Sequence, residues 1–201
     1  MSHYFQTPTG QLRPRQVRAT IWGREYTFAS SNGVFSADRL DLGTGVLLRT
    51  CTPDPDSTAD LLDLGCGFGP IAVALADQCP HARVTAVDVN DRALELTWRN
   101  ATAYGVADRL RVCRPEQVDP DLRFAEIWSN PPIRIGKTAL HELLTTWLGR
   151  LTPGGVARLV VGRNLGADSL HTWLAAQGWD VRRIASAKGF RVLEVHPTSR
   201  P

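Results

Sequence analysis

The feature that most constrains the fold is a regular alternation, from Leu61 onward, of short apolar runs with longer amphipathic stretches. Runs such as LLDLG, VTAVDV, LRVC, EIWSN and ARLVVG have the length of strands, and the stretches between them have the length of helices. Strands that alternate with helices indicate βαβ units, which build a mostly parallel sheet with helices on both faces. The sequence therefore predicts a Rossmann-like α/β fold.

Both ends of the chain depart from this alternation. The segment DVRRIASAKGFRVLEVH has two strand-like runs around Lys188 and Gly189 with no helix between them, which predicts a hairpin and an antiparallel last strand. Residues 16–30 contain two short runs rich in β-branched and aromatic residues around Gly23, which predicts a second hairpin. We expect seven strands in the main sheet and a small amino-terminal β-hairpin extension.

A turn-rich segment, CTPDPDSTAD, separates this extension from the alternating region, after a loop and a short helix over residues 31–50. The chain has 201 residues, of which 43% are apolar and 21% charged, as is typical of a globular domain. We therefore expect a single domain over residues 1–201, with an extension at residues 1–58 and a cofactor-binding core at residues 59–201.

Composition excludes several classes of protein and site. No window approaches the roughly 18 consecutive apolar residues of a membrane span, and the amino-terminal residues contain no apolar signal segment. The four cysteines form no C-x-x-C pair and have no cluster of histidines nearby, so we expect reduced thiols and no metal site. A cytoplasmic protein that makes no contact with a membrane is the expectation.

Charge is distributed unevenly along the chain, whose net charge is +3. Residues 1–30 carry +3 and residues 181–201 carry +4, which leaves the middle near −4. Basic ends suit contact with a polyanion if they meet in space. However, only two of the 23 basic residues are lysines, a skew that genome base composition produces by itself. Charge alone therefore does not identify nucleic acid as a partner.

A glycine-rich loop, GCGFG at residues 65–69, directly follows the apolar strand that ends at Leu64. Pro70 can then open a helix, since proline is favoured at the first helical position. Glycines let the backbone approach a ligand closely, and the free N–H groups of a helix start favour an anionic group. The G-x-G-x-x-G spacing of dinucleotide sites fails at Pro70, which disfavours a nicotinamide-dependent oxidoreductase.

Two acidic residues flank this loop in the predicted sheet. Asp63 lies in the strand before it, and Asp88 ends the next strand, where a carboxylate can accept two hydrogen bonds from a ribose diol. Together these features indicate a cofactor that contains ribose and lacks a pyrophosphate. Taken separately, the loop could be a tight turn, and Asp88 could cap the helix expected at residues 90–105.

The motifs DLGCGFGPIAVALA, AVDVN and SNPPI, at this spacing, resemble the class I S-adenosylmethionine (SAM)-dependent methyltransferases. The segments SNGVFSADRLDLGTGVLL and SNPPIRIGK are similar to their small-domain family, which includes ribosomal RNA guanine-N2 methyltransferases of the 16S type. The likeness runs from about residue 3 to residue 196. It implies a seven-stranded sheet with an antiparallel last strand, SAM as cofactor, S-adenosylhomocysteine as product, and ribosomal RNA or a ribosomal subunit as partner.

The resemblance also implies roles for individual residues. Asp63 and the glycine loop would surround the methionine part of SAM, Asp88 would hold the ribose, and the next two residues would flank the adenine. Glu116 takes the place of an aspartate that the family commonly has near the adenine amino group, and it is one methylene longer. The implied cofactor-binding residues are Asp63, Gly65, Cys66, Gly67, Gly69, Asp88, Val89, Asn90, Glu116 and Asn130.

The tetrapeptide Asn130, Pro131, Pro132 and Ile133 follows the strand EIWS and is the expected catalytic element. Prolines supply no N–H, which leaves the Asn130 side-chain oxygen and the Pro131 carbonyl as acceptors for a bound amine. In the related enzymes these acceptors align an NH2 group with the methyl group. The chemistry needed is orientation and stabilisation of the positive charge that develops on nitrogen.

One position departs from the family pattern, since many amino-methyltransferases have Tyr or Phe where this chain has Ile133. Either Phe35 or another aromatic residue supplies the stacking platform, or the acceptor is not a planar base. Arg134, Lys137 and the Arg-rich hairpin are candidate contacts to RNA phosphates.

We expect SAM-dependent N-methylation of the exocyclic N2 amine of a guanine in ribosomal RNA. Two alternatives stay open: N-methylation of a protein amide or a small-molecule amine, and a non-enzymatic protein that binds RNA or SAM. Related guanine enzymes often carry a second, duplicated domain, whereas this chain resembles a single-domain form. Whether it acts as a monomer or a homodimer is left open by the sequence.

Overall fold

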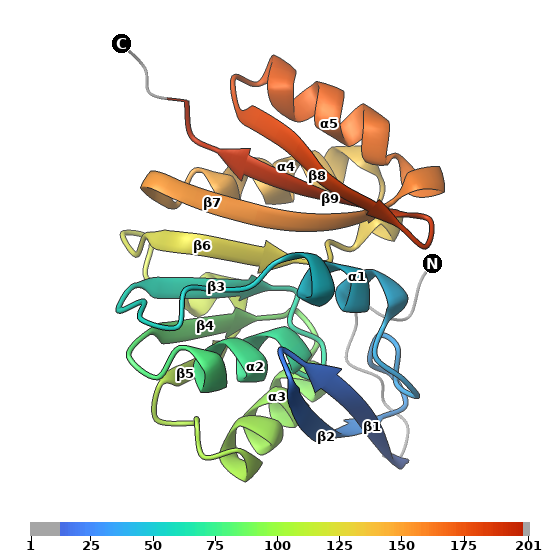
Figure 1. The fold of residues 1–201 in the computed structure, drawn as a ribbon, viewed down its shortest axis with the longest axis vertical. Coiled ribbons are helices and arrows are strands. Elements are labelled where there is room, and N and C mark those ends of the chain that lie inside the picture. The colour runs from blue at the N-terminus through green and yellow to red at the C-terminus, as the bar shows by residue number, and fades with distance from the viewer. Residues whose placement is uncertain (1–12, 199–201) are drawn as a thin grey trace.

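The computed structural model describes residues 13–198 (Figure 1). Its strands are β1 Pro14–Ile21, β2 Arg24–Ser31, β3 Asp60–Leu64, β4 Arg83–Val87, β5 Leu110–Cys113, β6 Phe124–Ser129, β7 Leu151–Gly162, β8 Asp180–Ala187 and β9 Phe190–His196. Its α-helices are α1 Leu42–Thr50, α2 Pro70–Gln78, α3 Asp91–Ala103, α4 Lys137–Leu148 and α5 Ala167–Ala176. Short 3-10 helices follow three strands: η2 Pro115–Gln117, η3 Ile133–Ile135 and η4 Arg163–Leu165.

The main sheet has seven strands in the order β5-β4-β3-β6-β7-β9-β8. The pairs from β5 to β7 are all parallel, whereas β9 is antiparallel to both β7 and β8. The predicted α/β class, the strand number and the antiparallel last strand are confirmed. Strand order reverses between β3 and β6, and in open α/β sheets a ligand binds at the carboxyl ends of the strands beside such a reversal.

The amino-terminal hairpin is a separate two-stranded sheet in which β1 pairs with β2 along their whole length, as predicted. Its two-residue turn has positive φ at both positions, 48° at Trp22 and 82° at Gly23, as a type I′ turn requires. The Trp22 indole donates to the Cys51 carbonyl (2.9 Å) and contacts the ring of Trp128 edge-on. Trp22 thus has a positive φ, which is uncommon for a tryptophan, and its side chain is held by two contacts.

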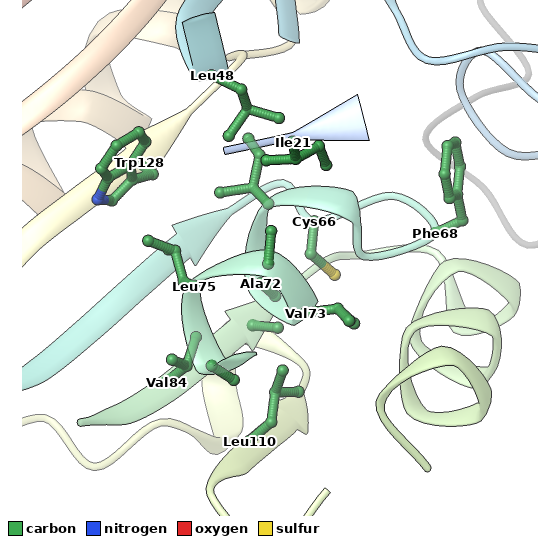
Figure 2. Packing of buried hydrophobic residues seen from close by; sticks show 14 of the residues in the cluster. Ile21, Leu48, Cys66, Phe68, Ala72, Val73, Leu75, Val84, Leu110 and Trp128 are labelled. Carbon is green, nitrogen blue, oxygen red and sulfur yellow. The ribbon is translucent and has the colours of Figure 1, made fainter. Parts of the chain in front are cut away.

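Two apolar clusters fill the two faces of the sheet. One cluster contains α1, α2 and α3 together with the inner face of the hairpin, and the other contains α4 and α5. Figure 2 shows Ile21 of the hairpin and Leu48 of α1 over the residues of α2. Tyr26 and Arg24 of β2 both bond to Asp77 of α2. The extension and the glycine-loop side of the sheet thus share one core.

Two kinds of feature are absent from residues 13–198. None of their helices is long and apolar enough to cross a bilayer. Their His, Cys, Asp and Glu side chains form no group of three or more that could hold a metal ion. The four cysteines are buried free thiols.

Candidate active site

Three parallel strands end side by side at the carboxyl edge of the sheet. Leu64 of β3 pairs with Val87 of β4 and with Ser129 of β6, and the Ser129 hydroxyl donates to the Leu64 carbonyl (2.7 Å). The next residue of each strand is therefore brought to one place, which is the strand reversal of the sheet. These next residues are Gly65, Asp88 and Asn130.

The glycine loop is open at two of its glycines. Gly65 and Gly67 have φ of 80° and 59°, and a Cβ built on either would meet no atom within 4 Å. By contrast, the Cys66 side chain is buried in the core beside Thr97, and burial raises the pKa of its thiol. Cys66 therefore offers a ligand only its backbone.

Gly69, the third glycine of the motif, lies against another helix. A Cβ there would lie 2.9 Å from side-chain atoms of Thr97 on α3, and the residue has φ of 88°. The family resemblance implies that Gly69 lies around the cofactor. In the structure, packing explains the glycine at this position, because the absence of a side chain lets the start of α2 approach α3.

Asp63 is fully buried beneath the loop. Its Oδ2 accepts a hydrogen bond from the backbone N–H of Ala72 (2.9 Å), whereas its Oδ1 has no partner among residues 13–198. Burial raises the pKa of Asp63 to about 8. An unpartnered oxygen on a buried carboxyl is costly, so this position favours a ligand that brings a donor or a positive charge.

Asp88 ties the end of β4 to the loop. Its Oδ2 accepts from the N–H of Gly67 and its Oδ1 from the N–H of Asn90, both at 3.0 Å. Burial raises the pKa of this carboxyl, and the backbone N–H groups and the charge of Arg114 oppose that shift. Each oxygen keeps a lone pair that can accept from a ribose hydroxyl.

The predicted adenine-side residues differ in their surroundings. Val89 is exposed, whereas Asn90 is buried, and its amide is held by the protein at both ends. The Asn90 Oδ1 accepts from the N–H of Arg92 at the start of α3, and its Nδ2 donates to the Gly33 carbonyl (2.8 Å). Its side chain therefore joins α3 to the extension, and Val89 is the freer of the two to contact a base.

Glu116 lies in η2 with an exposed side chain that faces Arg114 at 3.9 Å. Arg114 also donates to Asp91 at the start of α3 (2.8 Å), and its charge acts to lower the pKa of Asp88. Glu116 thus lies just after the carboxyl end of β5, where a contact with an adenine amino group is predicted. Its side chain, however, is exposed to solvent and faces Arg114.

Asn130 is held by two residues that the sequence interpretation did not single out. Its Nδ2 donates to Asp41 Oδ1 (2.7 Å) and to Thr44 Oγ1 (3.1 Å), both at the start of α1. Its Oδ1 remains unbonded among the described residues. The signal that could have found Asp41 is its place directly before an apolar helix, since aspartate is a preferred N-cap.

The remaining predicted residues differ in how much of each is exposed. The Pro131 carbonyl already accepts from the N–H of Ile133 (2.8 Å), so one lone pair remains for a substrate. Ile133 is half-buried and packs against the cluster of α4, while Phe35 has half its surface exposed. Arg134 and Lys137 are exposed, as contacts to phosphate would require.

The family model described as "Methyltransferase small domain" matches residues 25–194. The chain belongs to this family. Uncharacterized protein YbxB of Bacillus subtilis is 29% identical to it over 195 residues, which is 96% of each chain. Ribosomal RNA small subunit methyltransferase C of Citrobacter koseri is 36% identical over 147 residues, or 69% of this chain and 42% of that protein.

Among solved structures, the 16S rRNA N2 methyltransferase RsmC of T. thermophilus, in complex with AdoMet and guanosine, is similar with a TM-score of 0.75. The two are 25% identical, and the match covers 95% of this chain and 52% of that one. This chain therefore spans about half the length of the named rRNA methyltransferases that it matches. It is a SAM-dependent methyltransferase related to RsmC.

The residues of this small-domain methyltransferase fit SAM. The open space at Gly65 and Gly67 leaves room for a ligand against the backbone, and the unpartnered Asp63 Oδ1 suits the ammonium group of its methionine part. Asp88, at the end of the adjacent strand, has lone pairs for the ribose. These residues are expected to hold SAM.

The raised pKa of Asp63 predicts that SAM binding depends on pH. A cation beside Asp63 favours its charged form, so binding should release a proton below the pKa of about 8, and affinity should rise by up to tenfold per unit between about pH 6 and 8. Calorimetry in buffers of different ionisation enthalpy measures this release. The matched variant is Asp63→Asn, whose amide oxygen still accepts from Ala72. Because the amino group of SAM titrates near 8, an equal proton release in both proteins would contradict the assignment.

Asp88→Ala is expected to weaken SAM binding by about 1.5–3 kcal/mol, which is the range of hydrogen bonds to charged groups. The variant removes a ribose acceptor and also frees the N–H of Gly67 and Asn90. Isothermal calorimetry measures the affinity, with Glu95→Ala, at an exposed position on α3, as the control. Unchanged affinity in Asp88→Ala would refute the ribose role.

Proposed function

We propose that this methyltransferase acts on the exocyclic N2 amine of a guanine in ribosomal RNA. The observation that carries the proposal is the orientation of Asn130, whose two N–H donors are occupied while its oxygen is unbonded at the strand reversal. An acceptor at this place selects a substrate that offers an N–H, such as an amine or amide. The similarity to ribosomal RNA methyltransferases supports guanine in RNA as that substrate.

When bound, SAM supplies an electrophilic methyl group on a sulfonium. The protein then needs to position the attacking nitrogen, and we assign this to Asn130 Oδ1 and the free lone pair of the Pro131 carbonyl. Both accept N–H hydrogens of the amine, which aims the nitrogen lone pair and stabilises the positive charge that grows on it. The two prolines limit movement of this backbone, because each fixes its own φ.

We assign the cofactor and Asn130 to a core at residues 59–201, and contacts with RNA to the extension at residues 1–58 together with Arg134 and Lys137. Arg18 on the outer face of β1 and these two residues are exposed, so they can meet phosphates without reading sequence. Since ribosomal RNA is the proposed substrate, we place the reaction in the cytoplasm.

The test is incubation of the purified protein with methyl-labelled SAM and, separately, naked ribosomal RNA, small subunits, large subunits and total cell protein. All four come from a strain that lacks the gene. Label that digests to N2-methylguanosine is the expected result and also identifies the subunit. Label only in protein would instead favour an amide as acceptor. No label with any of the four, despite measurable SAM binding, would favour a non-enzymatic protein.

A further inference from the structure

Asn130 can serve as an acceptor only while its amide keeps one of two orientations. An asparagine amide has an oxygen and a nitrogen of similar size, and a half-turn about its last bond exchanges them. One orientation presents an acceptor to an incoming amine, and the other presents a donor, which would repel it. Something in the fold must therefore select between the two.

The partners at the start of α1 make this selection. Asp41 is a carboxylate, which accepts hydrogen bonds and cannot donate, and it lies 2.7 Å from Asn130 Nδ2. The Thr44 hydroxyl accepts the second N–H at 3.1 Å. A flipped amide would place its oxygen against the Asp41 carboxylate, so the hydrogen bond from Nδ2 would be replaced by a repulsive contact between two acceptors. The observed orientation is thus strongly favoured.

We propose that Asp41 is a positioning residue for methyl transfer, which fixes the acceptor orientation of Asn130 with the help of Thr44; this inference rests on the proposed function. The hydrogen bond from Asn130 to Asp41 is charge-assisted, and such bonds are short and about twice as strong as neutral ones. The carboxylate also polarises the amide, which increases the negative charge on Oδ1.

Asp41 is itself held in place by the helix it caps. Its Oδ1 accepts from the N–H of Thr44 (3.0 Å), and its carbonyl accepts from the N–H of Gly45 (2.8 Å). The adjoining Gly43 is closely packed, since a Cβ there would lie 2.8 Å from Phe190 and 3.0 Å from Asp41 Oδ1. A rigid, mostly buried helix therefore presents Asp41 to a loop 89 residues further along the chain.

Capping and positioning can be separated by two substitutions at the same residue. Serine caps a helix as well as aspartate does, but its shorter side chain does not reach Asn130, so Asp41→Ser keeps the cap and loses the contact. Asparagine is the same size as aspartate and can both cap and accept, so Asp41→Asn keeps both. Asp56→Ser, at an exposed aspartate of the same extension, is the matched control.

The first measurement needs neither cofactor nor substrate. In 15N NMR of the free protein, the Asn130 side-chain N–H signals, assigned by their loss in Asn130→Asp, should show two distinct protons that exchange slowly with water. Asp41→Ser should speed this exchange at least tenfold, whereas Asp41→Asn and Asp56→Ser should not. Equal exchange in wild type and Asp41→Ser would overturn the inference, even if the protein transferred no methyl group to any acceptor.

The second measurement uses labelled SAM and unmodified ribosomal RNA. Asp41→Ser should lower kcat by about 10- to 100-fold, as expected for a displaced catalytic group, with the Kd for SAM within about twofold of wild type. Asp41→Asn should restore most of the rate, and thermal unfolding should be alike in all variants. A purely capping role predicts full activity in Asp41→Ser and would contradict the proposal.

Discussion

Asn130→Ala is expected to lower kcat by about 100- to 1,000-fold while the Kd for SAM stays within about twofold of wild type. We expect this fall in kcat because the variant removes one preorganised group that stabilises developing charge. In other enzymes the loss of one such group lowers kcat by about 100- to 1,000-fold. The Asn130 oxygen accepts no hydrogen bond from residues 13–198. Removing this oxygen therefore leaves no N–H or O–H of these residues without its acceptor. Turnover of labelled SAM with ribosomal RNA and calorimetry of SAM binding measure the two quantities.

The control for this variant is Asn164→Ala, which removes an exposed amide in η4. It should leave both turnover and SAM affinity unchanged. A mutation that acts only on the transition state lowers kcat without changing ground-state binding. Parallel loss of SAM affinity and turnover in Asn130→Ala would mean that Asn130 chiefly holds the cofactor, contrary to our assignment.

Gly69→Ala is expected to lower the free energy of unfolding by about 2–4 kcal/mol. An alanine at φ of 88° is strained by about 1–2 kcal/mol, and its Cβ would meet Thr97 at 2.9 Å, which adds the cost of overpacking. The Thr97 Cα lies at 3.1 Å from the same point, so rotation of the threonine side chain does not relieve the contact. Urea denaturation measures the change.

Gly67→Ala is the matched comparison, because Gly67 also has positive φ but has no atom within 4 Å of the Cβ position. It should cost only about 1–2 kcal/mol of stability, the price of the left-handed backbone. Its effect should instead fall on SAM affinity, since the added methyl group would occupy the open side of the loop. Equal destabilisation by the two variants would show that backbone strain, and not Thr97, explains the glycine at position 69.

Asp63 is expected to make the free energy of unfolding of the ligand-free protein depend on pH. The folded state raises the pKa of this carboxyl from an ordinary value of 3.8 to about 8, so the folded protein binds the proton more tightly than the unfolded chain. The contribution of Asp63 to stability should therefore fall as pH rises from about 4 to 8. The Asp63→Asn variant should lack this component in denaturation at several pH values.

Much of the fold could be predicted because its determinants are local in the chain. The alternation of apolar runs with amphipathic stretches fixes the parallel sheet, and the helix expected at residues 90–105 is α3, Asp91–Ala103. The short link at Lys188 and Gly189 requires β8 and β9 to be antiparallel neighbours, as the structure confirms. Each of these features depends on residues within one or two elements.

The contacts around Asn130 and Gly69 could not be predicted in the same way. Asp41 reaches Asn130 across 89 positions, and whether it does so depends on where α1 packs on the sheet. Likewise, the pattern of the glycine loop does not reveal that Gly69 faces Thr97 of the next helix. The sequence motif identifies where the site lies, and the packing of whole elements decides what each of its residues touches.

The side chain of Asn100 has a consequence for how the molecule opens. Its amide accepts from the N–H of Ala29 (2.7 Å) and donates to the carbonyls of Ala29 (2.9 Å) and Phe68 (2.8 Å), so one buried group holds both β2 and the glycine loop. Neither can detach without leaving part of this amide unsatisfied. In native-state hydrogen exchange, the amides of β2 and α2 should then share one opening free energy. The hairpin would then belong to the same cooperative unit as the cofactor loop, so the two would open together.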